Sequence, residues 1–418
     1  MEIERRNYIE QLERRRGNGL VKVITGCRRS GKSYLLFRLF KQYLINEGVE
    51  ERDIIELALD RIDNDYLREP HALYDYLTAK ISDEGRYYYV FLDEIQFVER
   101  FEEVLNSLLH FSNVDVYVTG SNSKLLSKDI ITEFRGRGDE IRVHPLSFSE
   151  FMSGYQGESR KGWQDYLLYG GLPRVLQFPT DEQKAKYLED LFKETYLKDI
   201  IERYEIRNAN ELGELVNILA SAVGSLTNPS KLERTFKSIK GSDITDKTIA
   251  AYIGYLEDAF LLNGAMRYDV KGKKYIDTPV KYYFEDVGLR NARLGFRQSE
   301  YNHLMENIIY NELVCRGYSV DVGVVEVSTV EPDGVRKRVN LEIDFIATRG
   351  SEKYYIQSAF SMPDAEKLSQ EERPLNSTGD SFKKIIVTGD NIATARNDKG
   401  IVLFNVIDFL LDKESLKK

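Results

Sequence analysis

The chain has 418 residues, 42% of them hydrophobic and 30% charged, with a formal net charge of −9. This composition supports packed cores, the length predicts about three domains, and the two cysteines and four histidines argue against a disulfide scaffold or a dedicated zinc site. The acidic balance disfavours bulk wrapping of nucleic acid but allows a local basic patch. We expect a cytoplasmic protein without a membrane segment, because no apolar run approaches the ~18 residues of a membrane helix and the N-terminus lacks the apolar core of a signal peptide.

The strongest motif lies at residues 26–33, GCRRSGKS, which fits G-x-x-x-x-G-K-S. The apolar run 20–25 predicts a buried strand before it, and YLLFRLFKQYLI predicts a helix after it. In such a loop the glycines let backbone N–H groups turn toward phosphate oxygens, the lysine reaches the β- and γ-phosphates and the serine hydroxyl meets Mg²⁺. We expect the nucleotide to contact Gly26, Arg28, Arg29, Ser30, Gly31, Lys32, Ser33 and Tyr34, with Ser33 also a metal ligand. The two arginines either contact phosphates or hold acidic residues of another domain.

An acidic pair follows the next predicted strand, YYYVFL at residues 87–92. In an open α/β sheet, a carboxylate at the C-terminal end of a strand lies beside the phosphate crevice. We expect Asp93 to hold Mg²⁺, directly or through water, and Glu94 to polarise the attacking water. The alternative is a surface acidic pair, which the accompanying phosphate loop disfavours.

A third predicted strand, residues 114–119, leads into Gly-Ser-Asn-Ser. Ser121 or Asn122 is placed to contact the γ-phosphate or the attacking water. Because Ser123 precedes a helical pattern, an N-cap is an equally good interpretation of these polar residues.

Two arginines follow in a glycine-containing loop, FRGRG. Arg135 or Arg137 suits a finger that neutralises charge on a transferring phosphoryl group, acting within the chain or on a neighbouring copy. A plain surface arginine is an alternative of similar weight.

The motifs together resemble a group of bacterial and archaeal AAA-type ATPases. The resemblance rests on VITGCRRSGKSYLL, VFLDEIQ, VYVTGSNSKLLS, HPLSFSEF and YLLYGGLPRVL, and it extends over almost the whole chain. It implies binding of ATP with Mg²⁺, an AAA-like core, a winged-helix segment and a nuclease-like C-terminal fold. The cellular task of this group is poorly defined.

The middle of the chain predicts three helices and a hairpin. The helices begin near residues 211, 230 and 246, and AMRYDV and KKYIDTP form the hairpin. This order is that of a winged helix-turn-helix, in which the third helix and the turn lysines Lys271, Lys273 and Lys274 would contact DNA. Because the third helix carries Glu257 and Asp258, a protein or intramolecular contact is the favoured interpretation.

The last hundred residues predict an α/β unit that resembles the restriction-endonuclease-like fold. Glu306 and Asp344 match the first two acidic positions of active members, whereas Gln357 and Ala359 stand where a second metal-binding acid and a lysine belong. Losing both should abolish metal-assisted hydrolysis, so we expect a catalytically dead fold. The lysines that would have to substitute are Lys353 or Lys367.

These observations predict an α/β protein with four parts. They are an AAA-like P-loop ATPase core at 1–160, a helical lid or connector at 161–210, a winged-helix domain at 211–294 and a degenerate restriction-endonuclease-like domain at 295–418. The predicted function is Mg²⁺-dependent ATP hydrolysis that moves the later domains, on DNA or on a protein partner, with a homo-oligomer as one possible assembly. A slow nucleotide-gated switch is the alternative, and an ATP-dependent nuclease is disfavoured.

Overall fold

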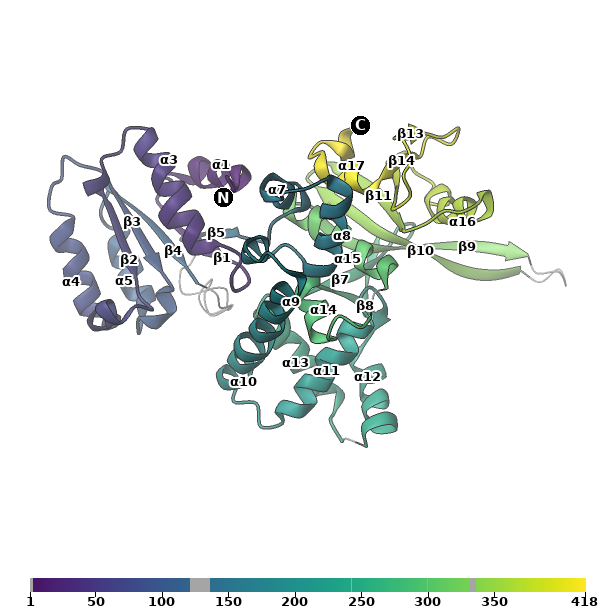
Figure 1. Ribbon diagram of the computed structural model, residues 1–418, viewed down its shortest axis with the longest axis horizontal. Helices are drawn as coiled ribbons and strands as arrows, with labels where there is room; N and C mark the ends of the chain where they lie inside the picture. Colours follow the sequence, from purple (N-terminus) through teal and green to yellow (C-terminus); the bar gives the residue numbers. More distant parts are fainter. Residues whose placement is uncertain (1–2, 121–135, 242, 299, 331–335) are drawn as a thin grey trace. The chain divides into compact units, whose positions relative to one another are not determined.

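The computed structural model describes residues 3–120, 136–241, 243–298, 300–330 and 336–418 (Figure 1). Within these ranges the chain forms two compact units. The N-terminal unit comprises residues 1–145 with Asp258–Phe260, and the C-terminal unit comprises residues 146–257 and 261–418. In the described ranges, every helix is too short or too polar to cross a membrane.

The N-terminal unit is built on a parallel five-stranded sheet with the strand order β2-β3-β4-β1-β5. Its elements are α1 (Arg6–Arg15), β1 (Val21–Thr25), α2 (Lys32–Tyr34), the π-helical turn η1 (Leu35–Phe40), α3 (Lys41–Asn46), η2 (Glu51–Asp53), β2 (Ile54–Ala58), η3 (Ile62–Arg68), α4 (Pro70–Lys80), β3 (Tyr88–Asp93), η4 (Ile95–Phe97), α5 (Phe101–Leu108), β4 (Val114–Thr119) and β5 (Gly138–Arg142). The three central strands are buried along their whole length and are mostly apolar, and the charges within β1 and β4, Lys22 and Asp115, form a buried ion pair. All five C-terminal strand ends meet at one edge of the sheet, where the phosphate loop and the acidic pair also lie.

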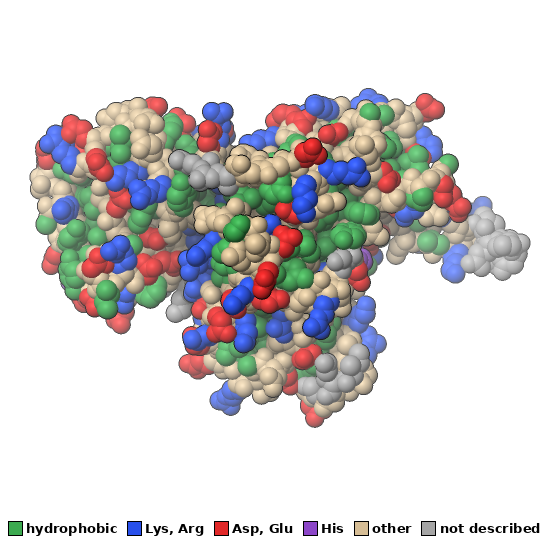
Figure 2. All heavy atoms as spheres, in the orientation of Figure 1, with side chains coloured by type: hydrophobic (Ala, Val, Ile, Leu, Met, Phe, Trp, Pro, Cys, Tyr) green, Lys and Arg blue, Asp and Glu red, His purple; other side chains and the backbone are tan. Residues whose placement is uncertain are grey.

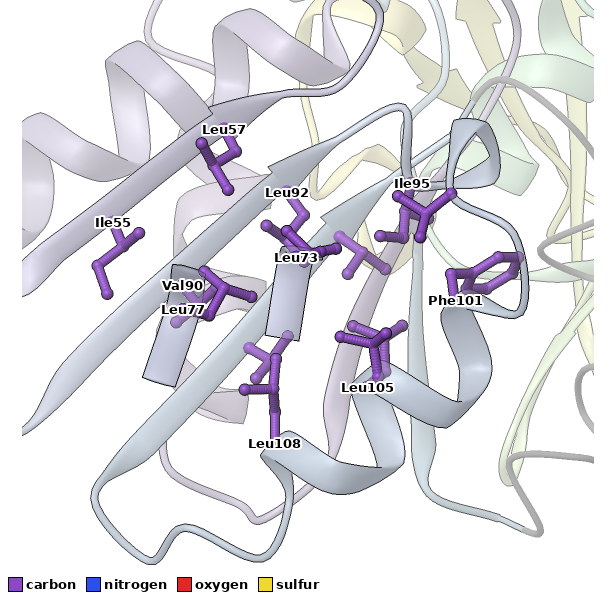
Figure 3. Packing of buried hydrophobic residues seen from close by; sticks show 14 of the residues in the cluster. Ile55, Leu57, Leu73, Leu77, Val90, Leu92, Ile95, Phe101, Leu105 and Leu108 are labelled. Atoms are coloured by element: carbon purple, nitrogen blue, oxygen red, sulfur yellow. The ribbon is translucent and has the colours of Figure 1, made fainter. Parts of the chain in front are cut away.

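Helices cover both faces of this sheet. Alternate residues of β3 divide between the faces: Val90 and Leu92 pack with α4 and α5 (Figure 3), whereas Phe91 packs with α1, η1 and α3. Leu73 and Leu105 are among the helical side chains that close the first face, and both are fully buried. The core therefore fixes the strand ends that carry the candidate site.

The C-terminal unit contains helices and a mixed nine-stranded sheet with the order β13-β14-β12-β11-β10-β9-β7-β8-β6. Its helical elements are α7 (Phe148–Gly154), α8 (Ser159–Tyr169), η6 (Pro173–Gln177), α9 (Asp181–Asp190), η7 (Leu191–Leu197), α10 (Lys198–Arg203), α11 (Ala209–Ser221), α12 (Pro229–Thr235), η8 (Phe236–Lys240), α13 (Asp246–Asp258), α14 (Val287–Arg293), α15 (Tyr301–Cys315), α16 (Ala365–Asn376), α17 (Val406–Leu411) and η9 (Ser415–Lys417). Its strands are β6 (Leu226–Thr227), β7 (Leu262–Asp269), β8 (Lys274–Phe284), β9 (Ser319–Val330), β10 (Arg336–Arg349), β11 (Glu352–Ala359), β12 (Lys383–Thr388), β13 (Ala395–Arg396) and β14 (Val402–Asn405).

The domain boundary expected at residue 294 does not divide this sheet, because strands from both sides of that residue belong to it. The hairpin β7–β8 pairs with β9 through parallel contacts such as Arg267 with Val322, so it continues the sheet formed by the last hundred residues. Strand β6 adds to the other side of β8. Hydrogen bonding between strands distant in sequence therefore joins the two predicted domains.

The first boundary was expected at residue 160, whereas the C-terminal unit begins at Leu146. Helix α7 begins at a capping box in which Ser147 and Glu150 each bond the other's backbone N–H. Its Phe148 packs edge-on against Trp163 and Tyr166 of α8. This aromatic packing places α7 in the C-terminal unit, which begins at Leu146.

Candidate nucleotide-binding site

The phosphate loop joins β1 to the helical run of α2, η1 and α3. Gly26 and Gly31 have φ values of 131° and 99°, which favour glycine, and Arg29 has a φ of 64°. A Cβ on Gly26 would lie 2.1 Å from the carbonyl oxygen of Val143. The first glycine is therefore required by the backbone conformation and by the close approach of the segment after β5.

Lys32 lies inside the curve of this loop. It is buried, and its Nζ donates hydrogen bonds of 2.9 Å to the carbonyl oxygens of Gly26 and Cys27. Burial lowers the pKa of the Lys32 ammonium, although Cys27, Glu94 and Asp93 oppose that shift. The lysine is thus held at the loop by carbonyl oxygens, with the acidic pair close enough to act on its charge.

Asp93, the last residue of β3, connects the phosphate loop to β4. Its Oδ1 accepts a hydrogen bond of 2.9 Å from the Ser33 hydroxyl and another from the Thr119 hydroxyl. The backbone N–H of Glu94 in turn donates to Thr119 Oγ1 at 3.2 Å. Burial raises the pKa of Asp93, while the bonds from Thr119 and Ser33 work in the opposite direction. Asp93 is therefore bonded to Ser33, the other residue expected to hold a metal, and to Thr119 through one carboxylate oxygen.

Thr119 is a site residue that the sequence motifs did not identify. It ends β4 opposite Ile24 of β1, so it reaches the same sheet edge as the phosphate loop. The available signal was a hydroxyl at the end of a buried strand, one residue before the glycine that precedes Ser121.

Glu94 stands directly after β3 in a left-handed conformation, with a φ of 53°. Its Oε2 accepts a hydrogen bond from the Gln96 side-chain amide, whereas Oε1 of Gln96 is buried without a hydrogen-bond partner. A non-glycine residue in this region carries strain of about 1–3 kcal/mol, a feature that clusters at functional sites. The structure therefore holds the proposed base in a defined orientation beside Asp93.

The remaining predicted loop residues have different environments. Ser30 is fully buried and Arg28 is half-buried, whereas Arg29 and Tyr34 are exposed beside the loop. Ser121, Asn122 and Arg135, for which contacts with the nucleotide or the attacking water were expected, lie outside the described residues.

Arg137 lies at the opposite edge of the sheet. Its carbonyl accepts the Val21 N–H at 2.9 Å, and Val21 is the first residue of β1, whereas the phosphate loop follows the last. The five residues of β1 separate the two ends by roughly 16 Å. Its side chain donates to Asn106 at 3.2 Å. The geometry therefore disfavours Arg137 as a finger for the site of its own chain.

A second charged cluster lies in the C-terminal unit and contains the predicted nuclease-like acids. Glu306 of α15 and Asp344 of β10 are brought together by Lys281 of β8, with Nζ–O distances of 2.8 and 3.6 Å, and Glu342 lies 2.8 Å from the same ammonium. Burial and the charge of Glu306 raise the pKa of Asp344 to about 7. Gln357 accepts the Asp344 N–H at 3.4 Å. The lysine that reaches these acids therefore comes from the hairpin.

The lysines suggested as substitutes make other contacts. Lys353 lies over the rings of Tyr268 and Phe382, at 5.4 and 5.1 Å, and Lys367 pairs with Glu371 at 2.5 Å. Ala359 belongs to an apolar cluster. None of these contacts joins the Glu306–Asp344 cluster, whose cation is Lys281.

Comparison with known proteins supports the nucleotide-binding interpretation. Residues 18–152 match the AAA domain family, and residues 160–300 match a domain of unknown function (DUF8612). An uncharacterized protein of Haemophilus influenzae is 35% identical over 98% of both chains, and an uncharacterized protein of Methanocaldococcus jannaschii is 27% identical over 93% of this chain and 85% of its own length.

Similarity to solved structures is weak. The ORC1 protein of Aeropyrum pernix, solved in complex with DNA, is 12% identical over 70% of this chain and 92% of its own, with a TM-score of 0.33. A score this low supports no conclusion about function. The Haemophilus influenzae protein, in contrast, is similar over 98% of both chains. The chain therefore belongs to the same family as the Haemophilus influenzae protein, and residues 18–152 of it match the AAA domain family.

Proposed function

We propose that the N-terminal unit binds ATP with Mg²⁺ and hydrolyses it, and that hydrolysis moves the C-terminal unit. The observation that carries the proposal is the convergence of Ser33 and Thr119 on one oxygen of Asp93, beside the buried Lys32. Three segments of the chain, the phosphate loop and the ends of β3 and β4, meet there at the carboxyl edge of a parallel sheet, where ligands of open α/β sheets bind.

The donor atoms at this edge fit a magnesium ion. Ser33 Oγ and Asp93 Oδ1 lie 2.9 Å apart, and both are hard oxygen ligands of the kind Mg²⁺ prefers. These two residues would hold the ion together with phosphate oxygens. When bound, Mg²⁺ neutralises charge on the phosphates.

The side chains of the site have distinct roles in this proposal. Lys32 exchanges its two carbonyl acceptors for phosphate oxygens, because an ammonium bonds an anion more strongly than a neutral carbonyl. Glu94 orients the attacking water and accepts its proton, and Gln96 fixes the direction of that carboxylate. Thr119 positions Asp93 and the Glu94 backbone together.

Phosphate release and nucleotide binding test the proposal. Lys32→Ala should abolish both, whereas Glu94→Gln should keep ATP binding and lose turnover. Lys80→Ala and Glu99→Gln change exposed residues of the same unit and should match the wild type. If the wild-type protein neither binds nor hydrolyses ATP in the presence of Mg²⁺, the proposal is wrong.

We further propose that Arg137 completes the site of a neighbouring copy. It is exposed and lies at the edge of the sheet away from its own phosphate loop. A mixture of Arg137→Ala and Glu94→Gln chains tests this, because each variant is inactive alone but their mixture contains sites with an intact glutamate and an intact arginine. Recovered turnover, with a mass increase by light scattering on adding Mg²⁺ and ATP, supports a homo-oligomer. A mixture as inactive as its components contradicts the role in trans.

For the middle of the chain, we favour an intramolecular role over DNA binding. The three helices α11, α12 and α13, the strand β6 and the hairpin β7–β8 follow the order of a winged helix-turn-helix, but one edge of that hairpin pairs with β9. All three lysines of the turn are exposed, but Lys271 bonds the Glu326 carbonyl at 2.7 Å, which leaves Lys273 and Lys274 as the better candidates for a DNA contact. Figure 2 shows acidic and basic side chains interspersed over the visible surface.

Fluorescence anisotropy with duplex DNA over a salt series tests the remaining alternative. Binding that weakens with salt and is lost in Lys273→Ala/Lys274→Ala would favour DNA contact. No binding at low salt would favour the intramolecular role.

A nuclease remains the disfavoured alternative, because Lys281 places its ammonium between Glu306 and Asp344. Mg²⁺-dependent nicking of a plasmid that Asp344→Ala abolishes would overturn this view. The slow-switch alternative differs only in rate, and ADP that copurifies with the protein together with very slow phosphate release would favour it.

A further inference from the structure

A buried arginine at the start of α1 connects the phosphate loop to another segment of the N-terminal unit. Nη1 of Arg5 donates to the Ser30 carbonyl at 3.0 Å, and Nη2 donates to the His144 carbonyl at 2.8 Å. Arg5 is only 6% exposed. One planar guanidinium therefore bridges two backbone carbonyls that are far apart in sequence.

Tyr8, one turn further along α1, supports this bridge. The Arg5 guanidinium lies 4.5 Å from the centre of the Tyr8 ring, and the His144 N–H donates to the Tyr8 hydroxyl at 3.1 Å. Both the N–H and the carbonyl of His144 are thus held by α1. Arg5 itself has a φ of 48°, a strained conformation for a side chain of this size.

One of the two bridged carbonyls belongs to the phosphate loop and the other to the segment that follows β5. Ser30 lies within the phosphate loop, directly before Gly31. His144 lies in the segment that leaves the N-terminal unit, and the residue before it, Val143, donates to the Thr25 carbonyl at 2.8 Å and closely approaches Gly26. The departing segment therefore contacts the start of the loop directly and is connected to its other end through Arg5.

The chain is anchored again immediately afterwards, in the C-terminal unit. The Leu146 N–H donates to the Gly171 carbonyl at 2.7 Å, and the Leu146 carbonyl accepts from the Tyr166 hydroxyl at 2.7 Å. Only Pro145 lies between an anchor of one unit and an anchor of the other. A single residue therefore separates His144 from the first anchored residue of the C-terminal unit.

We propose that Arg5 is the positioning residue through which the phosphate loop controls this linker. The inference rests on the proposed nucleotide binding and adds the route by which it is transmitted. Phosphates that draw the Lys32 ammonium away from the Gly26 and Cys27 carbonyls reorient the loop peptides, Ser30 among them. Because the same guanidinium holds His144, that reorientation changes the restraint on the linker.

Hydrogen–deuterium exchange of the peptide covering residues 140–150 measures this coupling. In the wild type, a non-hydrolysable ATP analogue with Mg²⁺ should change the exchange of that peptide. Arg5→Met should abolish the change although the protein still binds the analogue, because Arg5 bonds the Ser30 and His144 carbonyls and not the nucleotide. Arg5→Lys keeps the charge but lacks the planar fork, so it should bind nucleotide and still lose most of the change. Arg6→Met, at the exposed neighbouring position, should behave as the wild type.

The outcomes separate the two proposals. Wild-type protein that binds the analogue without any change in this peptide contradicts the coupling and leaves the ATPase proposal standing, whereas absence of binding contradicts the ATPase proposal itself. A wild-type response in Arg5→Met, or an equal loss in Arg6→Met, also contradicts the coupling. If thermal unfolding shows that Arg5→Met is not folded, Arg5→Lys alone decides, because it keeps the buried charge but lacks the planar fork that spans both carbonyls. An undiminished response in that variant would overturn the inference.

Discussion

Replacing Thr119 by valine tests the geometry of the candidate site most directly. Valine keeps the shape of the side chain but removes the hydroxyl that donates to Asp93 and accepts the Glu94 N–H. A hydrogen bond to a charged group contributes about 1.5–3 kcal/mol, so we expect turnover to fall roughly 10- to 150-fold. Nucleotide binding should be affected less, because Lys32 and the loop are unchanged.

The pH dependence of this variant gives a second measure. Burial already raises the pKa of Asp93, and the Thr119 hydroxyl opposes that shift. Without the hydroxyl the pKa rises further, so a larger fraction of Asp93 is protonated at any given pH and cannot ligate Mg²⁺. The acidic limb of the rate profile should therefore move to higher pH.

Phosphate release, measured across pH at saturating ATP, checks both effects. Thr119→Ser keeps the hydroxyl and should retain most of the activity. Thr78→Val is the matched control, since the Thr78 hydroxyl donates only to backbone carbonyls within α4. Wild-type turnover and an unshifted acidic limb in Thr119→Val would refute the role given to this residue.

Two substitutions test the surrounding structure. Lys281→Met leaves three carboxylates around an apolar side chain and should destabilise the C-terminal unit by about 3–5 kcal/mol above pH 8 in urea unfolding. Because the pKa of Asp344 is already about 7 and rises without the lysine, the folded variant binds more protons than the unfolded chain, so the loss should shrink as the pH falls. The exposed Lys274→Met on the same strand should cost almost nothing, and an equal loss in both would contradict the argument. Gly26→Ala combines a φ of 131° with a Cβ only 2.1 Å from a backbone oxygen, so it should abolish ATP binding and cost about 2–4 kcal/mol. Gly48 has a φ of 92° with open space around it, so Gly48→Ala is the control for backbone strain alone. A loss of stability in Gly48→Ala as large as that in Gly26→Ala would show that the close contact with Val143 is unimportant.

Much of the N-terminal unit was predictable because its signals are local. A mostly apolar strand, two glycines, a lysine and a serine in order specify a loop before a helix, and in the structure β1 leads through this loop into α2, which begins at Lys32. Asp93 was predictable from its position at the end of an apolar strand. Thr119 was missed because a threonine that ends a strand fits its propensity for β-structure and carries no other signal.

The C-terminal unit was less predictable, because its determinants are distant in sequence. Sequence patterns predicted the hairpin and the later strands, but the pairing of β7 with β9 depends on the path of two intervening helices. Lys281 illustrates the difficulty, since nothing in the sequence around it shows that Glu306 and Asp344 will surround it. Ala359 stands where the resemblance places a lysine, and only the three-dimensional structure shows that Lys281, from another strand, reaches Glu306 and Asp344.

The continuous sheet of the C-terminal unit has a practical consequence for dissecting the protein. Ending the chain near residue 300, where the match to the domain of unknown function stops, would remove β9 and uncover the hydrogen-bonding edge of β7. It would also remove Glu306 and Asp344 and leave the Lys281 ammonium without the carboxylates that balance it. Exposed strand edges pair readily with other chains, so such a fragment should aggregate. Fragments divided at Pro145 keep this sheet intact, and they separate the N-terminal unit from the rest of the chain except for Asp258–Phe260.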